Sequence, residues 1–234
     1  MVSVITDEVS SDIDSLIKIL EETKLEYVEL RKINDKYLFE IDTGELRLIN
    51  KKLNNYKVSL IDSPIGKHKY SYDKENKLFI KYINICKIFK CKYLRIFTDV
   101  SDIEKYNNIA KENNITLLIE NEKGTKGESY IYLKELMNKK YSNIKLLYDA
   151  ENYYSLNLDY IEALRLLKDD IVYIHLRDIK GGKFVYLYDG EINIDKILNM
   201  INKDTIISLE THLPMCSNLK KEDLFKESIR RIYE

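Results

Sequence analysis

Short apolar runs rich in β-branched and aromatic residues recur eight times along the chain. The stretches between them carry apolar residues at spacings of three and four, as in Ile13, Leu16, Ile17 and Leu20, which is the pattern of amphipathic helices. We therefore expect eight strands, each followed by one helix. The expected strands span 2–6, 26–30, 57–61, 93–97, 116–120, 145–149, 172–176 and 206–210.

Regular alternation of strand and helix predicts a parallel sheet with right-handed crossovers. Eight such units within 234 residues favour an α/β protein that closes into a (β/α)8 barrel, or TIM barrel, as one domain over residues 1–234. An open doubly wound sheet is the alternative. It has less support, because the segment 6–10 after the first strand lacks a glycine-rich phosphate fingerprint. Within this scheme Ser101 with Glu104 fits a helix capping box, and Asn193 is expected to cap another helix.

The residues with special backbone or acid-base chemistry fall in connections that run from a strand's end to the next helix. Longer loops collect glycine and proline for structural reasons alone, so the histidines carry more weight. In a barrel all these connections lie on one rim, where active sites are found. The set comprises Gly44, Gly66, Gly124, Gly127, Gly181, Gly182, Gly190, Pro64, Pro214, His68, His175 and His212.

Four neighbouring expected strands end in a side chain that can bind a metal: Glu120, Asp149, His175 and Glu210. A carboxylate placed after three apolar residues pays a desolvation cost of several kcal/mol unless a cation or hydrogen bonds compensate. Each acid alone could equally be a charge bonded to a neighbouring loop. Together, three carboxylates and an imidazole favour one divalent metal ion, with Mn²⁺ first and Mg²⁺, Co²⁺ or Zn²⁺ as alternatives.

Further polar side chains are expected near the same mouth, where substrate hydroxyl groups need hydrogen-bonding partners. Arg177 and Asn152 lie two and three residues beyond the predicted ligands His175 and Asp149. Arg31, Lys67 and His68 follow the second and third strands. Each of the five could also be a surface charge or a partner of a ligand.

Composition narrows the classes of partner and compartment. The formal net charge is −1, from 38 basic and 39 acidic residues mixed along the chain, so no nucleic-acid partner is expected. The chain shows no signal-peptide pattern and no apolar run of membrane-spanning length. Three cysteines without a CxxC pair fit a reducing compartment. We therefore expect a cytoplasmic protein without a membrane partner, and a homo-oligomer is compatible with the sequence.

Several motifs in this order resemble one barrel family. They are DEVS at 7–10, YVELR at 27–31, IEN at 119–121, Asp149 with Asn152, HLRD at 175–178 and SLE at 208–210. The chain resembles the xylose isomerase-like TIM barrel superfamily, the sugar phosphate isomerase/epimerase family, over nearly its whole length. That superfamily includes tagatose and psicose epimerases, hydroxypyruvate isomerases, inosose dehydratases and endonuclease IV.

The resemblance implies roles for individual residues. Glu120 and Glu210 match the pair that moves protons in the epimerases, and Arg177 matches a substrate-contacting position. Family members often have a histidine where Asn152 stands, which is a departure from the pattern. The family's metal ligands match Glu120, Asp149, His175 and Glu210.

The function expected from this resemblance is a metal-dependent sugar, sugar phosphate or polyol isomerase or epimerase. One glutamate would remove a proton beside a carbonyl to give an enediolate, and the other would return it. A dehydratase of the inosose or dehydroshikimate type is the alternative, since the same enolate could expel a β-hydroxyl group. An endonuclease IV-like enzyme fits less well, because it needs a histidine-rich multi-metal site. A binding barrel without catalysis is the non-enzyme alternative.

Overall fold

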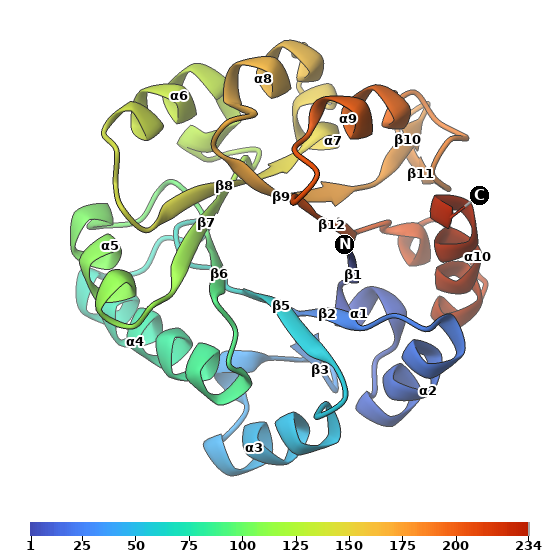
Figure 1. Ribbon diagram of the computed structural model, residues 1–234, viewed down its shortest axis with the longest axis horizontal. Coiled ribbons are helices and arrows are strands. Elements are labelled where there is room, and N and C mark those ends of the chain that lie inside the picture. The colour runs from blue at the N-terminus through green and yellow to red at the C-terminus, as the bar shows by residue number, and fades with distance from the viewer. Residues whose placement is uncertain (234) are drawn as a thin grey trace.

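The computed structural model describes residues 1–233, and Glu234, the last residue of the expected domain, lies outside the described residues. Eight parallel strands curl into a nearly closed barrel with helices around its outside (Figure 1). This confirms the predicted (β/α)8 fold. The barrel strands are β1 (Val2–Val4), β2 (Tyr27–Leu30), β5 (Lys57–Asp62), β6 (Tyr93–Ile96), β7 (Thr116–Glu120), β8 (Ile144–Asp149), β9 (Ile171–Leu176) and β12 (Ile206–Leu209).

From β2 to β12, each barrel strand pairs in parallel with the next barrel strand along the chain, and β12 pairs with β1. Among the described residues, the seam between β1 and β2 is joined by an isolated bridge from Ile5 to Glu29 instead of a continuous ladder. The predicted first strand ends early, at Val4, because Thr6 already begins a helical turn. The sheet is therefore continuous everywhere except at this short first strand.

One long helix follows each strand and covers the outer surface of the barrel. These helices are α2 (Ile13–Thr23), α3 (Thr43–Lys52), α4 (Tyr72–Phe89), α5 (Ile103–Glu112), α6 (Tyr130–Asn138), α8 (Tyr160–Leu167), α9 (Ile194–Met200) and α10 (Lys221–Tyr233).

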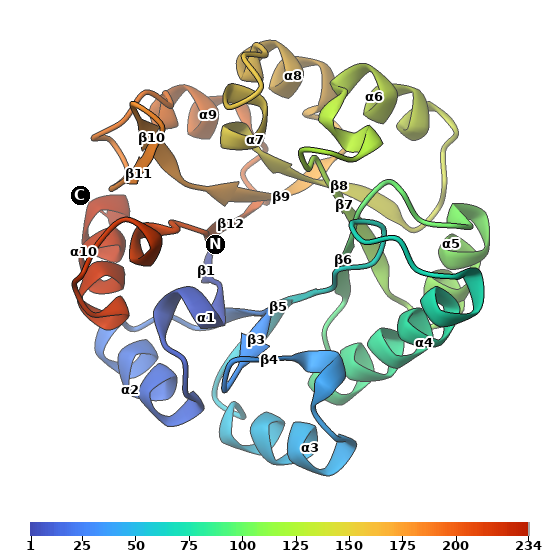
Figure 2. The ribbon, with the colours of Figure 1, turned by 180° about the vertical axis from the view of Figure 1, so that it is seen from behind.

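Extra short elements precede these helices, so the prediction of one helix per strand was incomplete. All of them lie in connections that leave the carboxyl ends of strands, and Figure 2 shows the barrel from behind with several in view. They are α1 (Thr6–Val9), β3 (Lys32–Ile33), β4 (Lys36–Tyr37), η1 (Leu38–Glu40), η2 (Lys126–Glu128), α7 (Ala150–Tyr154), β10 (Asp178–Lys180), β11 (Lys183–Val185) and η3 (Leu213–Met215).

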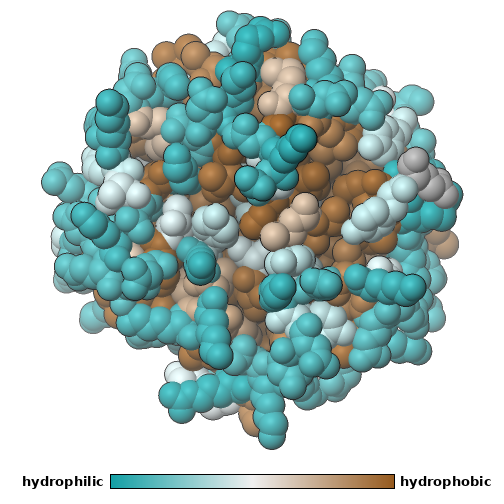
Figure 3. Space-filling view, viewed as in Figure 1, coloured by the Kyte–Doolittle hydropathy of each residue, from teal (hydrophilic) through white to brown (hydrophobic). Residues whose placement is uncertain are grey.

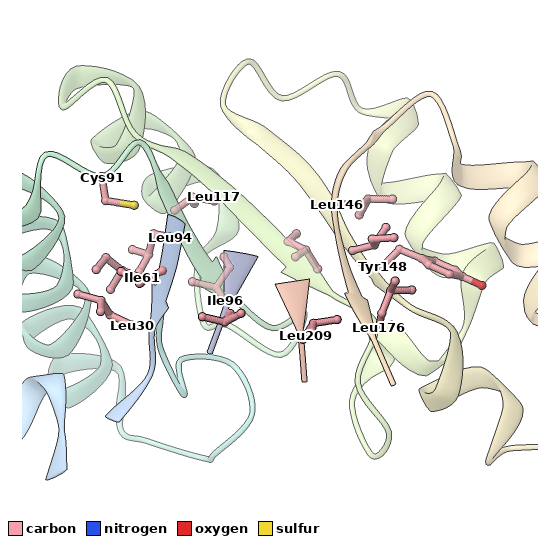
Figure 4. Packing of buried hydrophobic residues seen from close by; sticks show 14 of the residues in the cluster. Leu30, Ile61, Cys91, Leu94, Ile96, Leu117, Leu146, Tyr148, Leu176 and Leu209 are labelled. Carbon is pink, nitrogen blue, oxygen red and sulfur yellow. The ribbon is translucent and has the colours of Figure 1, made fainter. Parts of the chain in front are cut away.

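The period of two along each strand sends alternate side chains to opposite faces of the sheet. In β7, Leu117 and Ile119 belong to the large apolar cluster between sheet and helices, whereas Leu118 belongs to a second cluster. Figure 4 shows part of the large cluster. Glu120 is two residues beyond Leu118 and so faces the barrel interior. The second cluster, inside the barrel, comprises Leu60, Leu118, Leu147, Tyr173 and Ile206.

Helix caps follow local hydrogen bonding. Asn193 caps α9 as predicted, since its side chain accepts from the backbone N–H of Lys196 at 3.0 Å. The prediction of a capping box at Ser101 was wrong, because Asp102 caps α5 instead. The Ser101 hydroxyl is occupied elsewhere, donating to Glu75 Oε1 at 2.7 Å.

Hydrophilic side chains cover most of the face seen in Figure 3, and hydrophobic ones show between them. Within residues 1–233, no helix combines the length and the apolar character that crossing a membrane requires.

Candidate metal centre and substrate pocket

The four predicted metal ligands lie together at the carboxyl end of the barrel. Glu120 and Asp149 end β7 and β8, His175 lies in β9, and Glu210 directly follows β12. One ligand atom from each side chain lies within 4.8 Å of all the others. All four residues are at most 5% exposed. Alternation along four adjacent parallel strands thus gathers three carboxylates and one imidazole in a space that one ion could fill.

Local hydrogen bonds orient these groups. His175 Nδ1 lies 3.2 Å from Glu120 Oε1 and 3.2 Å from Glu210 Oε2. Asp149 Oδ1 accepts from the backbone N–H of Glu151 at 2.8 Å, at the start of α7. Asp149 Oδ2, which lies 2.7 Å from Arg177 Nη2, is the oxygen that could also meet a cation. Three oxygens and one nitrogen form a donor set that suits a divalent ion such as Mn²⁺ or Zn²⁺, so the residues present fit a metal.

Burial and mutual charge shift the pKa values of this cluster. Burial disfavours the His175 imidazolium, but the carboxylates of Glu29, Glu210 and Glu120 raise the pKa of His175 well above its usual value. Burial would raise the pKa of Glu210, yet His175 and Arg177 hold it well below its usual value. In the absence of a metal, these carboxylates therefore favour the protonated imidazole of His175. A divalent cation could replace that proton.

Asp149 behaves differently from the two glutamates. Burial raises its pKa to about 7, with Arg177 opposing the shift and the neighbouring carboxylates adding to it. Its ionised form is thus the least favourable of the three carboxylates in the absence of a cation.

Each ligand carboxylate contacts a different arginine, and two of these, Arg95 and Arg177, are buried. The sequence analysis missed Arg95. Its position two residues before Phe97 puts it on the side of β6 that faces the barrel interior, as that of Glu120 does in β7, and this alternation could have identified it. Its Nη1 also lies 3.3 Å from Asp62 Oδ2, another buried acid that was missed. The three pairs are Arg31 Nη1 with Glu210, Arg95 Nη1 with Glu120 Oε2 at 3.0 Å, and Arg177 Nη2 with Asp149 Oδ2 at 2.7 Å.

A cavity of about 770 Å³ opens above the cluster. This is large enough for a small-molecule substrate. Its wall includes both predicted catalytic glutamates and all five predicted substrate-binding residues, namely Glu120, Glu210, Arg31, Lys67, His68, Asn152 and Arg177.

The five substrate-binding candidates differ in how far they are already engaged. Asn152 Nδ2 donates to the Asn121 carbonyl at 2.8 Å, and its Oδ1 accepts from Arg177 Nη2 at 2.9 Å. The structure therefore makes Asn152 a support for Arg177. Lys67 and His68 are exposed at the mouth, where Lys67 Nζ lies 3.0 Å from Glu122 Oε2.

A second network joins the first and last connections of this rim. The backbone N–H of His212 donates to Glu8 Oε2 at 2.9 Å, and His212 Nδ1 lies 2.8 Å from Glu8 Oε1. Arg31 Nη2 donates to the same Oε1 at 2.8 Å. Glu8 lies in the DEVS segment, yet no pattern in the sequence distinguishes it from a surface acid. This network fixes the guanidinium that contacts Glu210.

Comparisons with solved structures agree with the fold. The IolI protein with a bound zinc atom superposes with a TM-score of 0.79 at 15% identity, covering 98% of this chain and 95% of that one. The probable 3-DHS dehydratase AsbF from Bacillus anthracis gives a TM-score of 0.78 at 17% identity, covering 99% and 98%. An L-ribulose 3-epimerase gives 0.73 at 15% identity, covering 99% and 92%.

At these identities the likeness shows the fold alone. No curated protein matches the chain in sequence. The model of one family, the xylose isomerase-like TIM barrel, does match it, over residues 17–234. Because that match spans most of the barrel and all four clustered ligands, the chain belongs to the xylose isomerase-like TIM barrel family.

Proposed function

We propose that the protein is a divalent metal-dependent isomerase or epimerase of a small carbohydrate-like substrate. The observation that carries the proposal is the pair Glu120 and Glu210, which share one ligand cluster and both face the pocket. Two carboxylates on different sides of one bound substrate can exchange protons with it without leaving their positions.

In this proposal, Glu120, Asp149, His175 and Glu210 hold the ion, with Mn²⁺ as the favoured metal. The ion would polarise a substrate carbonyl and stabilise the negative charge that develops on it. One of the two glutamates removes the proton beside that carbonyl, leaving an enediolate. The other glutamate, protonated from solvent before this step, gives its proton to the opposite face or to the neighbouring carbon.

Arg31, Arg95 and Arg177 tune this chemistry through the contacts described above. A guanidinium beside a carboxylate favours its ionised form. The pKa of Glu120 is lowered because Arg95 and His175 outweigh the effect of burial. An ionised glutamate is ready to accept a proton. Lys67 and His68 at the mouth, with Arg177 deeper in the pocket, would hold substrate oxygens.

A dehydratase is the second candidate. It is supported by the structural likeness to the probable 3-DHS dehydratase AsbF and by the fact that elimination needs the same two glutamates. Expulsion of a β-hydroxyl group would replace the second proton transfer to carbon.

The test uses the metal-loaded protein with a panel of ketoses, ketose phosphates, inososes and hydroxylated cyclic keto acids in D₂O. We expect NMR to show solvent deuterium at the carbon beside the carbonyl, with an isomer or epimer as product. A new ultraviolet-absorbing enone and loss of water would show the dehydratase instead. Stoichiometric metal without exchange on any substrate would overturn both and favour a binding barrel.

A further inference from the structure

Glu29 lies in the middle of β2, fully buried inside the barrel beneath the ligand cluster. Its Oε1 is 2.9 Å from His175 Nε2. Glu29 does not line the pocket and has no part in the proton transfers proposed above. An ionised carboxylate at such a site carries a large desolvation cost, which needs a specific compensating partner.

The second carboxylate oxygen of Glu29 is held from the opposite side. Tyr173 donates its hydroxyl hydrogen to Glu29 Oε2 at 2.8 Å. The Tyr173 oxygen is also 3.0 Å from Ser59 Oγ, which lies 2.6 Å from Ser3 Oγ. These groups form a buried polar column that rises from the floor of the barrel to His175.

The column leaves Glu29 as an acceptor on both oxygens. Tyr173 occupies Oε2, so Oε1 is left for the imidazole of His175 above.

We infer that Glu29 is a positioning residue that makes His175 bind the metal through Nδ1; the inference rests on the metal centre of the proposed function. A neutral imidazole has one N–H and one lone pair. Glu29 Oε1 accepts from Nε2, so the ring proton stays there, and the Nδ1 lone pair points at Glu120 and Glu210. Carboxylates that hold the far nitrogen of a histidine ligand in this way fix both tautomer and ring orientation.

The test compares Glu29→Gln and Glu29→Leu with the unaltered protein in two measurements that need no turnover. Calorimetric titration of metal-free protein with Mn²⁺ gives the affinity. We expect a loss of about 10-fold for Glu29→Gln, which keeps an acceptor oxygen, and of about 100-fold for Glu29→Leu, which does not. Glu75→Gln is the matched control, because Glu75 is another buried, hydrogen-bonded glutamate, placed in α4 outside the barrel.

The second measurement is ¹⁵N–¹H NMR of the histidine rings in Zn²⁺-loaded protein. With three histidines in the chain, single His→Gln variants assign the signals. We expect His175 to be protonated at Nε2 and metal-bound at Nδ1, and this pattern to be lost or mixed in Glu29→Leu. A structural role alone would lower stability in the Glu29 and Glu75 variants alike without changing the tautomer.

The outcomes separate this inference from the proposed function. If the unaltered protein binds no Mn²⁺ or Zn²⁺, the metal centre itself fails, and the inference with it. If it binds metal while the Glu29 variants keep the same affinity and tautomer, only the positioning role is overturned. Should Glu29→Leu fail to fold by circular dichroism, Glu29→Gln decides by the same two criteria.

Discussion

The two rims of the barrel differ in the groups they contain and in the free-energy cost of their structures. The carboxyl rim holds the short extra elements, the pocket and a dense group of buried charges. The amino rim consists of tight turns in which residues with long or amide side chains take the left-handed conformation that glycine prefers: Lys24, Lys90, Asn114 and Lys140, with φ of 56°, 53°, 55° and 56°.

The difference separates two kinds of strain. On the amino rim the cost is local and conformational, roughly 1 to 2 kcal/mol at each such turn. On the carboxyl rim, where Asn34, Asp35, Asn157, Tyr188 and His212 also have positive φ, an electrostatic cost is added. Acids and arginines are removed from water together there, and this cost is offset only while every partner is present. We expect activity to depend on the carboxyl rim, and substitutions on the amino rim to change stability without changing activity.

The largest effect should come from the proton-transferring pair. Glu120→Gln and Glu210→Gln keep the size of the side chain but remove the base, so we expect turnover to fall by about 100- to 10,000-fold. Steady-state kinetics on the substrate found in the D₂O panel measures this, with circular dichroism as the control for folding. Unchanged activity in both variants would contradict the mechanism.

Loss of Arg95 should be the most damaging change to stability on the carboxyl rim. Arg95→Met fills the space but leaves the buried acids Glu120 and Asp62 without their shared cation. We expect metal-free protein to lose about 3–5 kcal/mol, measured by urea unfolding. Replacing the exposed Arg47, on the outer helix α3, by Met is the comparison. Equal losses in the two variants would show that the buried pairing does not matter.

Metal should stabilise the carboxyl rim by mass action. At a free concentration 100 times the Kd, a divalent ion adds about 2.7 kcal/mol. Thermal unfolding with and without a chelator measures the gain, and we expect Asp149→Asn to lose most of it. A gain of the same size in Asp149→Asn would place the ion elsewhere.

The same centre should respond to pH in a fixed direction. The pKa of His175 is raised in the folded state, so its imidazolium stabilises metal-free protein fully below its unfolded pKa, about 6.5. That contribution is lost as pH rises through the higher folded value. Metal needs the deprotonated ring and an ionised Asp149, whose pKa is raised to about 7, so affinity should increase with pH. Titrations in buffers of different ionisation enthalpy should show proton release.

The smallest effect belongs to the amino rim. Lys90→Gly removes the strain of a left-handed residue at the end of α4, partly offset by the greater flexibility of unfolded glycine. We expect a net gain of about 0.5–1 kcal/mol, or a Tm about 1–4 °C higher, with activity unchanged. A change in turnover would mean that the rims are not independent.

Sequence reasoning succeeded where a pattern extends over many residues. The predicted strand 116–120 coincides with β7. The other barrel strands end within one residue of the predicted end, except the first. The four ligands followed from their place after apolar runs. Glu29 and Arg95 were missed because each stands inside a strand whose burial the pattern already explained. The two-residue strands β3 and β4 are too short to produce a pattern at all.

The bridge between Ile5 and Glu29 has a consequence for the order of assembly. Glu29 is at once part of the seam that joins β1 to β2 and the acceptor beneath His175. The first and last strands of the barrel must both be in place before that acceptor is enclosed and Glu210 reaches its neighbours. Metal uptake would then be a late folding event, and a bound ion would report that the barrel has closed.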